Sequence, residues 1–156
     1  MSDTAALPPL RRVVTGLDAD GKSCVLIDGP PRAAAMGGGG LIWRTEAIPA
    51  DNSPQQDCPG DEVTFELMHT PGSLFMVGDF APGRRTIMHA TDTIDYIVMM
   101  AGEVVLELET GETVLRAGDV SVDRGVVHAW RNDTDQTARI AFIIVPAKPV
   151  GAGRTV

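Results

Sequence analysis

The sequence predicts a single all-β domain built from antiparallel strands, and three observations lead to this prediction. From residue 63 onward, short runs rich in β-branched and aromatic residues are separated by turns that contain Gly or Pro-Gly, at the spacing of roughly 8 to 12 residues that is typical of sandwiches and barrels. Val104, Leu106 and Leu108 share one face of such a run. Glu107 and Glu109 share the other, which indicates a strand with one buried face. No segment shows a helical period over more than a turn or two.

The length and composition fit one domain with a substantial core, since 44% of the 156 residues are apolar. The net charge of -8 and the isoelectric point near 4.7 argue against nucleic acid or an anionic membrane as a partner, because phosphate binding requires clustered Lys and Arg. No apolar run approaches the ~20 residues needed to cross a bilayer. The N-terminus shows no signal-peptide pattern, and Cys24 and Cys58 have no CxxC spacing. We therefore expect a cytoplasmic protein with reduced thiols.

The chain before residue 63 is expected to form an extension of the main domain, beginning with a mobile tail at residues 1–9. The elements predicted after this tail are a β-hairpin (11–15 and 23–28), a glycine-rich loop (30–40), a short strand (41–48) and an exposed loop or lid (49–62). The chain is thus divided into an N-terminal extension (1–62), a barrel (63–146) and a flexible C-terminal tail (147–156).

The turn of the predicted hairpin matches a nucleotide-binding pattern. Residues Gly16 to Ser23 follow G-x-x-x-x-G-K-[ST], a pattern that holds phosphates only where a helix follows the loop. Here a β-type run follows instead, and Asp18 and Asp20 would set two carboxylates against the anion. We interpret the match as accidental and expect no nucleotide site.

Three polar residues, His89, Asp95 and His128, are expected to face the interior of the barrel. The runs predicted as β-like are 63–69, 73–80, 84–91, 94–100, 103–109, 112–116, 119–123, 126–131 and 137–145. Residues two apart in a strand share a face, so each polar residue has predicted neighbours. These are Arg85, Ile87 and Thr91 for His89, Val126 and Trp130 for His128, and Ile97 and Met99 for Asp95. Buried polar groups are costly unless they bond to each other, to a metal or to a ligand, which points to a site.

The spacing of these residues resembles the two motifs of the cupins. Gly83, five residues, His89-x-Thr91, three residues, Asp95, six residues and Gly102 follow the first motif, in which the family has His-x-His and then Glu. The second motif is matched by Gly118, Gly125, His128 and Asn132, with one residue fewer before the second Gly and no Pro. The resemblance covers residues 63–146. It implies an antiparallel double-stranded β-helix, or jelly-roll barrel, with the N-terminal hairpin as an addition.

The resemblance also implies a metal site. In metal-binding cupins, the first motif supplies two His and a Glu and the second motif supplies a His. Carried over position by position, His89, Asp95 and His128 would bind one divalent metal ion, and Thr91 stands where the second His is expected. Two His and one carboxylate suit Fe, Mn, Ni or Zn and leave positions open for substrate or oxygen. The alternative is a metal-free interior, with neutral imidazoles and an Asp95 that is bonded to backbone amides.

Other residues are candidates for contact with a bound molecule. Arg85 would hold a substrate carboxylate, or else form a salt bridge at the rim. Trp130 and Met99 fit a pocket wall and core packing equally. The remaining candidate is Thr91. Arg84 and His69 are expected to face solvent.

The predicted function is that of a small cupin that binds a small anionic or aromatic organic molecule. Family activities allow dioxygenase, decarboxylase, isomerase or lyase chemistry with one divalent metal ion. A metal-free binding or sensing module and an accessory protein are the alternatives. Similar cupins commonly pair through the outer sheet, with N-terminal strands reaching the neighbour, so we expect a homodimer.

Overall fold

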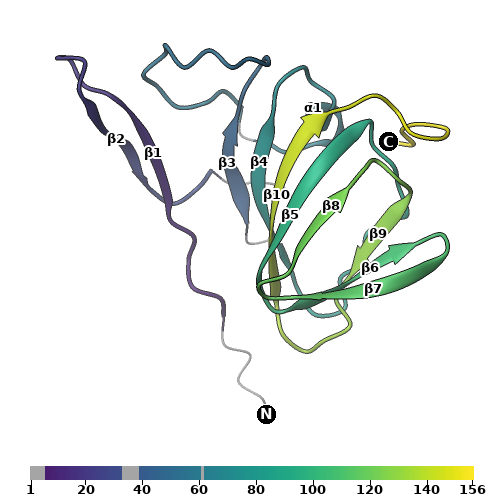
Figure 1. Ribbon diagram of the computed structural model, residues 1–156. Coiled ribbons are helices and arrows are strands. Elements are labelled where there is room, and N and C mark those ends of the chain that lie inside the picture. The colour runs from purple at the N-terminus through teal and green to yellow at the C-terminus, as the bar shows by residue number, and fades with distance from the viewer. Residues whose placement is uncertain (1–5, 33–38, 61) are drawn as a thin grey trace.

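The computed structural model describes residues 6–32, 39–60 and 62–156. Within these residues the structure is almost entirely β, as predicted (Figure 1). Its elements are β1 (Arg12–Leu17), β2 (Ser23–Gly29), β3 (Gly40–Arg44), α1 (Phe65–Met68), β4 (Leu74–Phe80), β5 (Thr93–Ala101), β6 (Glu103–Leu108), β7 (Gly111–Arg116), β8 (Val120–Asp123), β9 (His128–Arg131) and β10 (Ala138–Pro146). The first five residues of the expected mobile tail and the centre of the glycine-rich loop, 33–38, lie outside the described residues.

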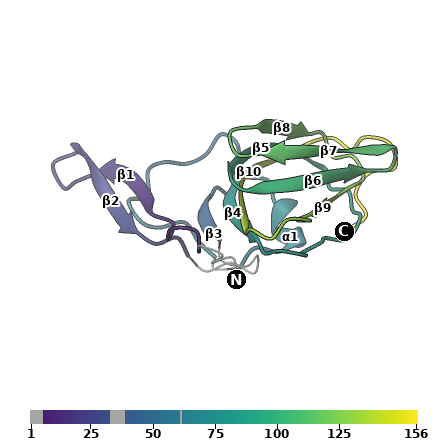
Figure 2. The ribbon, with the colours of Figure 1, turned by 90° about the horizontal axis from the view of Figure 1, so that it is seen from below.

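Strands β3 to β10 form two facing antiparallel sheets. One sheet has the order β3-β4-β10-β5-β8 and the other has the order β7-β6-β9. β10 pairs with both β4 and β5, so strands distant in sequence lie side by side, as in a jelly roll. The two sheets face each other (Figures 1 and 2), and they enclose the core without joining into one closed hydrogen-bonded barrel among the described residues. This arrangement confirms the predicted double-stranded β-helix.

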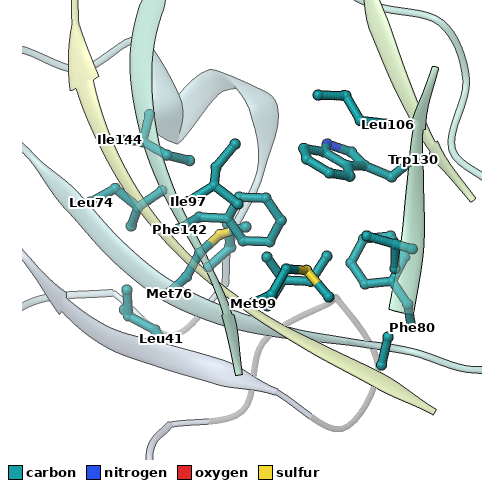
Figure 3. Close-up of a cluster of buried hydrophobic side chains, with 14 of the residues drawn as sticks. Leu41, Leu74, Met76, Phe80, Ile97, Met99, Leu106, Trp130, Phe142 and Ile144 are labelled. Atoms are coloured by element: carbon teal, nitrogen blue, oxygen red, sulfur yellow. The ribbon is translucent and has the colours of Figure 1, made fainter. Parts of the chain in front are cut away.

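The core lies between these two sheets. Figure 3 shows side chains from β4, β5 and β10, such as Met76, Met99 and Phe142, meeting Leu106 and Trp130 from the opposite sheet. Each of these residues is buried. Burial of side chains this large supplies most of the free energy that favours folding, at about 1.5–3 kcal/mol for each apolar one.

The predicted N-terminal hairpin is present and stands away from the sheets (Figures 1 and 2). β1 and β2 pair antiparallel with each other. Arg12 anchors the hairpin: its guanidinium is 2.7 Å from the Asp57 carboxylate and donates to the carbonyl oxygen of Ile42. Residues 49–62 were expected to form an exposed loop or a lid. Asp57 of this loop contacts the hairpin, and the described residues 49–60 do not line the pocket.

Two runs that were predicted as β-like take other forms. Residues 63–69 include α1 in place of a strand, because the Thr64 hydroxyl accepts a hydrogen bond from the Leu67 amide and caps a short helix. Residues 84–91 are extended but make only isolated bridges to β9, Arg85 with Arg131 and His89 with His128. The two bridges are four residues apart in this segment, from 85 to 89, but three residues apart in β9, from 128 to 131. The segment therefore has one extra residue, which makes a β-bulge and changes the side of the sheet to which the intervening side chains point.

The ends of this segment are fixed by polar contacts. Asn132, which is fully buried, donates its side-chain amide to the carbonyl oxygens of Phe80 and Gln136 and accepts from Thr134. The C-terminal residues, predicted as a flexible tail, hydrogen-bond to the segment's other end: the Arg154 amide donates to Asp92 and the Thr155 hydroxyl accepts from the Ala90 amide. No helix of the described residues is long and apolar enough to span a membrane.

Gly125 offers a test of the motif that leads into β9. Its φ is +76°, and an added Cβ would lie 2.6 Å from the Thr91 carbonyl oxygen. Gly118 has a φ of +94° with open space around it. Gly118→Ala should therefore lower the free energy of unfolding by about 1 kcal/mol, and Gly125→Ala should lower it clearly more, as measured by urea denaturation. Equal losses would contradict the close packing of this turn.

Candidate functional site

A cavity of about 320 Å³ opens between the two sheets beneath α1. One wall is apolar and includes Met76, Phe142 and Ile144 from β4 and β10, with Trp130 opposite them (Figure 3). Most polar lining residues come from the two motif segments. They are Arg84, Arg85, Thr86, His89, Thr91, Asp95 and His128, and Thr64 is added from the start of α1. An apolar pocket with a few converging polar groups is typical of small-molecule sites.

His89 and His128 face each other across the bridge between the bulged segment and β9. Each backbone amide donates to the other residue's carbonyl oxygen at 2.9 Å, and the ring centroids are 4.5 Å apart. Nδ1 of His89 is 2.9 Å from the Ile87 carbonyl oxygen, and Nδ1 of His128 is 2.9 Å from that of Val126. A carbonyl oxygen can only accept, so Nδ1 carries the proton in both rings. The lone pair of each neutral ring is therefore on Nε2.

Asp123 holds His128 from behind, and sequence reasoning missed it. Its Oδ2 lies 2.7 Å from Nδ1 of His128, and both side chains are 4% exposed. Its other oxygen accepts from the amides of Gly125 and Val126. The available signal was that Asp123-Arg-Gly125 occupies the place of Pro-x-Gly in the second motif. An acid two residues before a glycine commonly accepts hydrogen bonds from the following backbone.

The two imidazoles differ in electrostatics because only one has a carboxylate beside it. Burial lowers the pKa of His89, and the neighbouring His128 lowers it further. Burial also acts to lower the pKa of His128, but the hydrogen bond and negative charge of Asp123 outweigh this and raise it. His89 thus favours the neutral form, whereas His128 can stay protonated at pH values above the ordinary pKa of a histidine.

Thr91 links the first motif to its carboxylate. Its hydroxyl is 2.7 Å from that of Thr93, which donates to Oδ1 of Asp95 at 2.7 Å. Burial raises the pKa of the Asp95 carboxyl to about 6, and the hydrogen bond from Thr93 opposes this rise. Asp95 is inside with Ile97 and Met99, and Tyr96 is outside, as the strand parity predicts.

The donor set fits a metal ion in part. The two Nε2 lone pairs suit a divalent transition metal, and the carbonyls and Asp123 orient the rings as the outer partners of metal-binding histidines do. Thr91, in the place of a third imidazole, is bound to Thr93. In the part of the chain that the structure describes, no three His, Cys, Asp or Glu side chains are placed so that they could hold a metal together.

Arg84 and Arg85 both line the cavity, and they differ in exposure and in their partners. Arg85 was predicted to share a face with His89, but its side chain is 57% exposed and lies 2.6 Å from the Glu107 carboxylate, which places it at the rim. Ile87, expected in the core, is 64% exposed. Arg84, expected to face solvent, is half-buried and lines the cavity. The expectation that Arg84 faces solvent was therefore wrong, whereas the four residues predicted to share a face, Arg85, Ile87, His89 and Thr91, all line the cavity.

The remaining candidates divide between pocket and core. Trp130 lines the cavity and packs edge-on against His128 and Phe142. Met99 is buried in the core cluster and is not among the described lining residues. His69, expected to be exposed, ends α1 and accepts a hydrogen bond from the Asp92 amide through Nε2. Phe65 of α1, which the sequence did not suggest, packs its ring 5.1 Å from that of His89.

Asp123→Asn should lower the pKa of His128, because the substitution removes the charge that opposes burial. His128 stabilises the folded state when protonated, so its contribution is present below its unfolded pKa of about 6.5 and is lost as pH rises through the higher folded pKa. In Asp123→Asn this contribution should shrink. The pKa would be measured by NMR titration of the histidine ring. Asp119→Asn is the control, since that carboxylate caps the exposed Arg116 amide and its loss should leave His128 unchanged.

Comparison with known proteins agrees with the fold and the motifs. The cupin domain family matches residues 76–145. The chain is 35% identical to phomopsin biosynthesis cluster protein D of Diaporthe leptostromiformis, over 92% of this chain and 83% of that protein. It is 32% identical to the cupin-domain-containing oxidoreductase srdB of Neurospora crassa, over 89% of this chain and 74% of that protein. A cupin 2 conserved barrel domain protein from Salinispora arenicola has a similar structure, with a TM-score of 0.45, 22% identity and coverage of 48% of this chain and 64% of that one. On the fold, the motifs and the two sequence relatives together, the chain belongs to the cupin family.

Proposed function

We propose that this cupin is an enzyme that binds a small organic molecule in the cavity and acts on it with a divalent metal ion, Fe, Mn, Ni or Zn. His89 and His128 would hold the metal through Nε2, with Asp95 as the candidate third ligand. The observation that carries the proposal is that both imidazoles have Nδ1 bound to a backbone carbonyl. When neutral, each ring therefore has its lone pair on Nε2, beside one apolar cavity.

The names of the relatives favour oxidation among the reactions open to the family. Four of them are described as cupin-domain-containing oxidoreductases. We therefore place dioxygenase-type oxidation ahead of decarboxylase, isomerase or lyase chemistry for this chain. When bound, the metal would supply a Lewis acid that leaves positions open for substrate and oxygen.

The chain's own residues would bind and orient the substrate. Met76 and Phe142 on one side of the cavity and Trp130 on the other would exclude water from the reacting end of the molecule, and polar interactions inside a dry site are stronger. Phe65 lies over His89 and covers that end. Asp123 keeps the Nδ1 proton of His128 in place, so that Nε2 stays available. Thr93 holds the Asp95 carboxylate by a hydrogen bond, and the Thr91 hydroxyl bonds to that of Thr93.

A second candidate is a metal-free binding or sensing module that uses the same cavity. The observation that favours it is the ligand set itself: Thr91 replaces a histidine, and the described side chains include no cluster of three donors placed to hold a metal. A buried imidazole beside a carboxylate is also a good hydrogen-bonding partner for a polar ligand. Such a module would be stabilised by its ligand without forming a product.

Metal content separates the two candidates. Protein purified without chelator or a nickel column should contain close to one transition-metal ion per chain by mass spectrometry. His89→Ala and His128→Ala should each lose most of it, and His69→Ala, outside the cavity, should retain it. Thr91→His should increase the affinity for added metal by restoring a third imidazole. If wild-type protein carries no metal and His89→Ala leaves its affinity for added metal unchanged, the metal proposal is wrong and the binding module stands.

We further propose that the protein is a homodimer through the outer face of the five-stranded sheet. This face carries a group of exposed apolar side chains, 37% to 72% exposed: Phe75, Tyr96, Val98, Met100, Val120 and Val122. Contiguous apolar surface on a sheet commonly marks an interface. The β1–β2 hairpin, which has exposed apolar residues of its own, would extend the contact, since an isolated hairpin is only marginally stable.

Light scattering should therefore give twice the mass of the chain, 16.5 kDa. Replacing both Val120 and Val122 by Asp should produce a monomer, because two carboxylates would have to be buried without partners. Val150→Asp introduces the same charge at an exposed apolar residue of the C-terminal segment and should leave the dimer intact. A wild-type monomer would contradict this proposal and leave the proposed chemistry untouched.

A further inference from the structure

Arg84 is a half-buried cation with no acidic partner among the described residues. Its Nη1 donates to the backbone carbonyl oxygen of Asp79 at 3.0 Å, and its guanidinium carbon lies 4.9 Å from the centre of the Phe80 ring. The Asp79 carboxylate is already bound bidentately by Arg139. A charge taken partly out of water is costly unless an opposite charge meets it. The site is therefore short of one negative charge at this point.

The two contacts leave one edge of the guanidinium free. Nε and Nη2 make no hydrogen bond in the described part of the chain, and both atoms remain accessible to solvent there. These two nitrogens carry parallel N–H bonds, which is the geometry that binds both oxygens of a carboxylate. Arg85 offers no such edge, since its Nη2 is within 2.7 Å of both oxygens of Glu107.

Arg84 and the two histidines lie at opposite ends of the cavity. The Asn132 amide donates to the Arg84 carbonyl, and the backbones of His89 and His128 pair with each other. Asn132 and His128 are four residues apart along an extended chain, which places their Cα atoms about 13 Å from each other at ~3.3 Å per residue. The contacts with Asp79 and Phe80 keep the guanidinium at the Asn132 end. Apolar side chains, including Trp130 and Met76, line the space between.

We propose that Arg84 is the specificity-determining residue of the cavity and binds the carboxylate of an elongated substrate whose apolar body lies along Trp130. The substrate class is thus an aryl or alkyl carboxylic acid, with the carboxylate at the Arg84 end and the reacting carbon at the histidine end. This inference rests on the proposed function and specifies its substrate. It gives Arg84 the role that the sequence offered for Arg85, whose alternative, a salt bridge at the rim, is the one formed with Glu107.

The test uses two matched series of probes, 3-phenylpropanoate and 4-phenylbutanoate with their primary amides. Wild-type protein should bind the carboxylates roughly tenfold or more tightly than the amides, because only the anion gains the charge-assisted pair of hydrogen bonds. Arg84→Gln should reduce this preference to near unity while amide binding is unchanged, which shows that the cavity is intact. Arg84→Lys should keep part of the preference. Arg85→Gln, the control, should keep all of it.

Position is checked by NMR, since Arg84 also lines a second cavity of about 430 Å³ near residues 6–9. The aromatic protons of a bound carboxylate should show contacts to the Met76 methyl group. Equal affinity for carboxylates and amides, a preference that survives in Arg84→Gln, or the absence of contacts to Met76 would each overturn the inference. So would failure of both series to bind. The metal content of wild type and His89→Ala tests the proposed function separately, so failure of the one does not imply failure of the other.

Discussion

The pocket depends on the pairing of residues 84–91 with β9. Backbone hydrogen bonds place His89 opposite His128 at one end and Arg84 opposite Asn132 at the other. Between these two pairs, the segment has one residue more than β9, and the bulge accommodates this extra residue. This segment is no regular strand, so its order comes from what it touches: β9, the buried Asn132 side chain, and the C-terminal residues that bond to Ala90 and Asp92. A change in this pairing would move both histidines and the arginine together.

Burial of several polar groups between apolar sheets requires that each have a local partner. The structure supplies these partners mostly from the backbone a few residues away. Ile87 and Val126 accept from the two imidazoles, and the turn before β9 donates two amides to Asp123. Each group is therefore satisfied on one side and leaves its other side to the cavity. Such satisfaction reduces the cost of burial, and it also fixes the direction in which each group can act on a ligand.

The charges around the cavity are distributed unevenly, and this distribution sets the polarity of the site. On the outside of the three-stranded sheet, Arg85 and Arg131 are compensated by Glu107, Glu112 and Asp133. Inside, the histidine end has Asp123 and Asp95, whereas the arginine end has a cation whose described partners are a carbonyl group and an aromatic ring. A molecule with one anionic end and an apolar body complements this arrangement. The net charge of -8 for the chain as a whole gives no indication of it.

The sequence by itself determined the all-β fold, the N-terminal hairpin, and the burial of His89, Asp95 and His128. These follow from local features, namely turn residues, alternation along strands and motif spacing, which persist in any context. Only the tertiary structure decided that residues 65–68 form a helix over the cavity, that Asp123 holds His128, and that Arg84 lines the cavity and is more buried than Arg85. The helix cap and the Asp123–His128 pair are local contacts, whereas the position of Arg84 depends on its pairing with Asn132, far away in the sequence. One extra residue in a strand reverses every later side chain, and only the partner strand reveals where that residue lies.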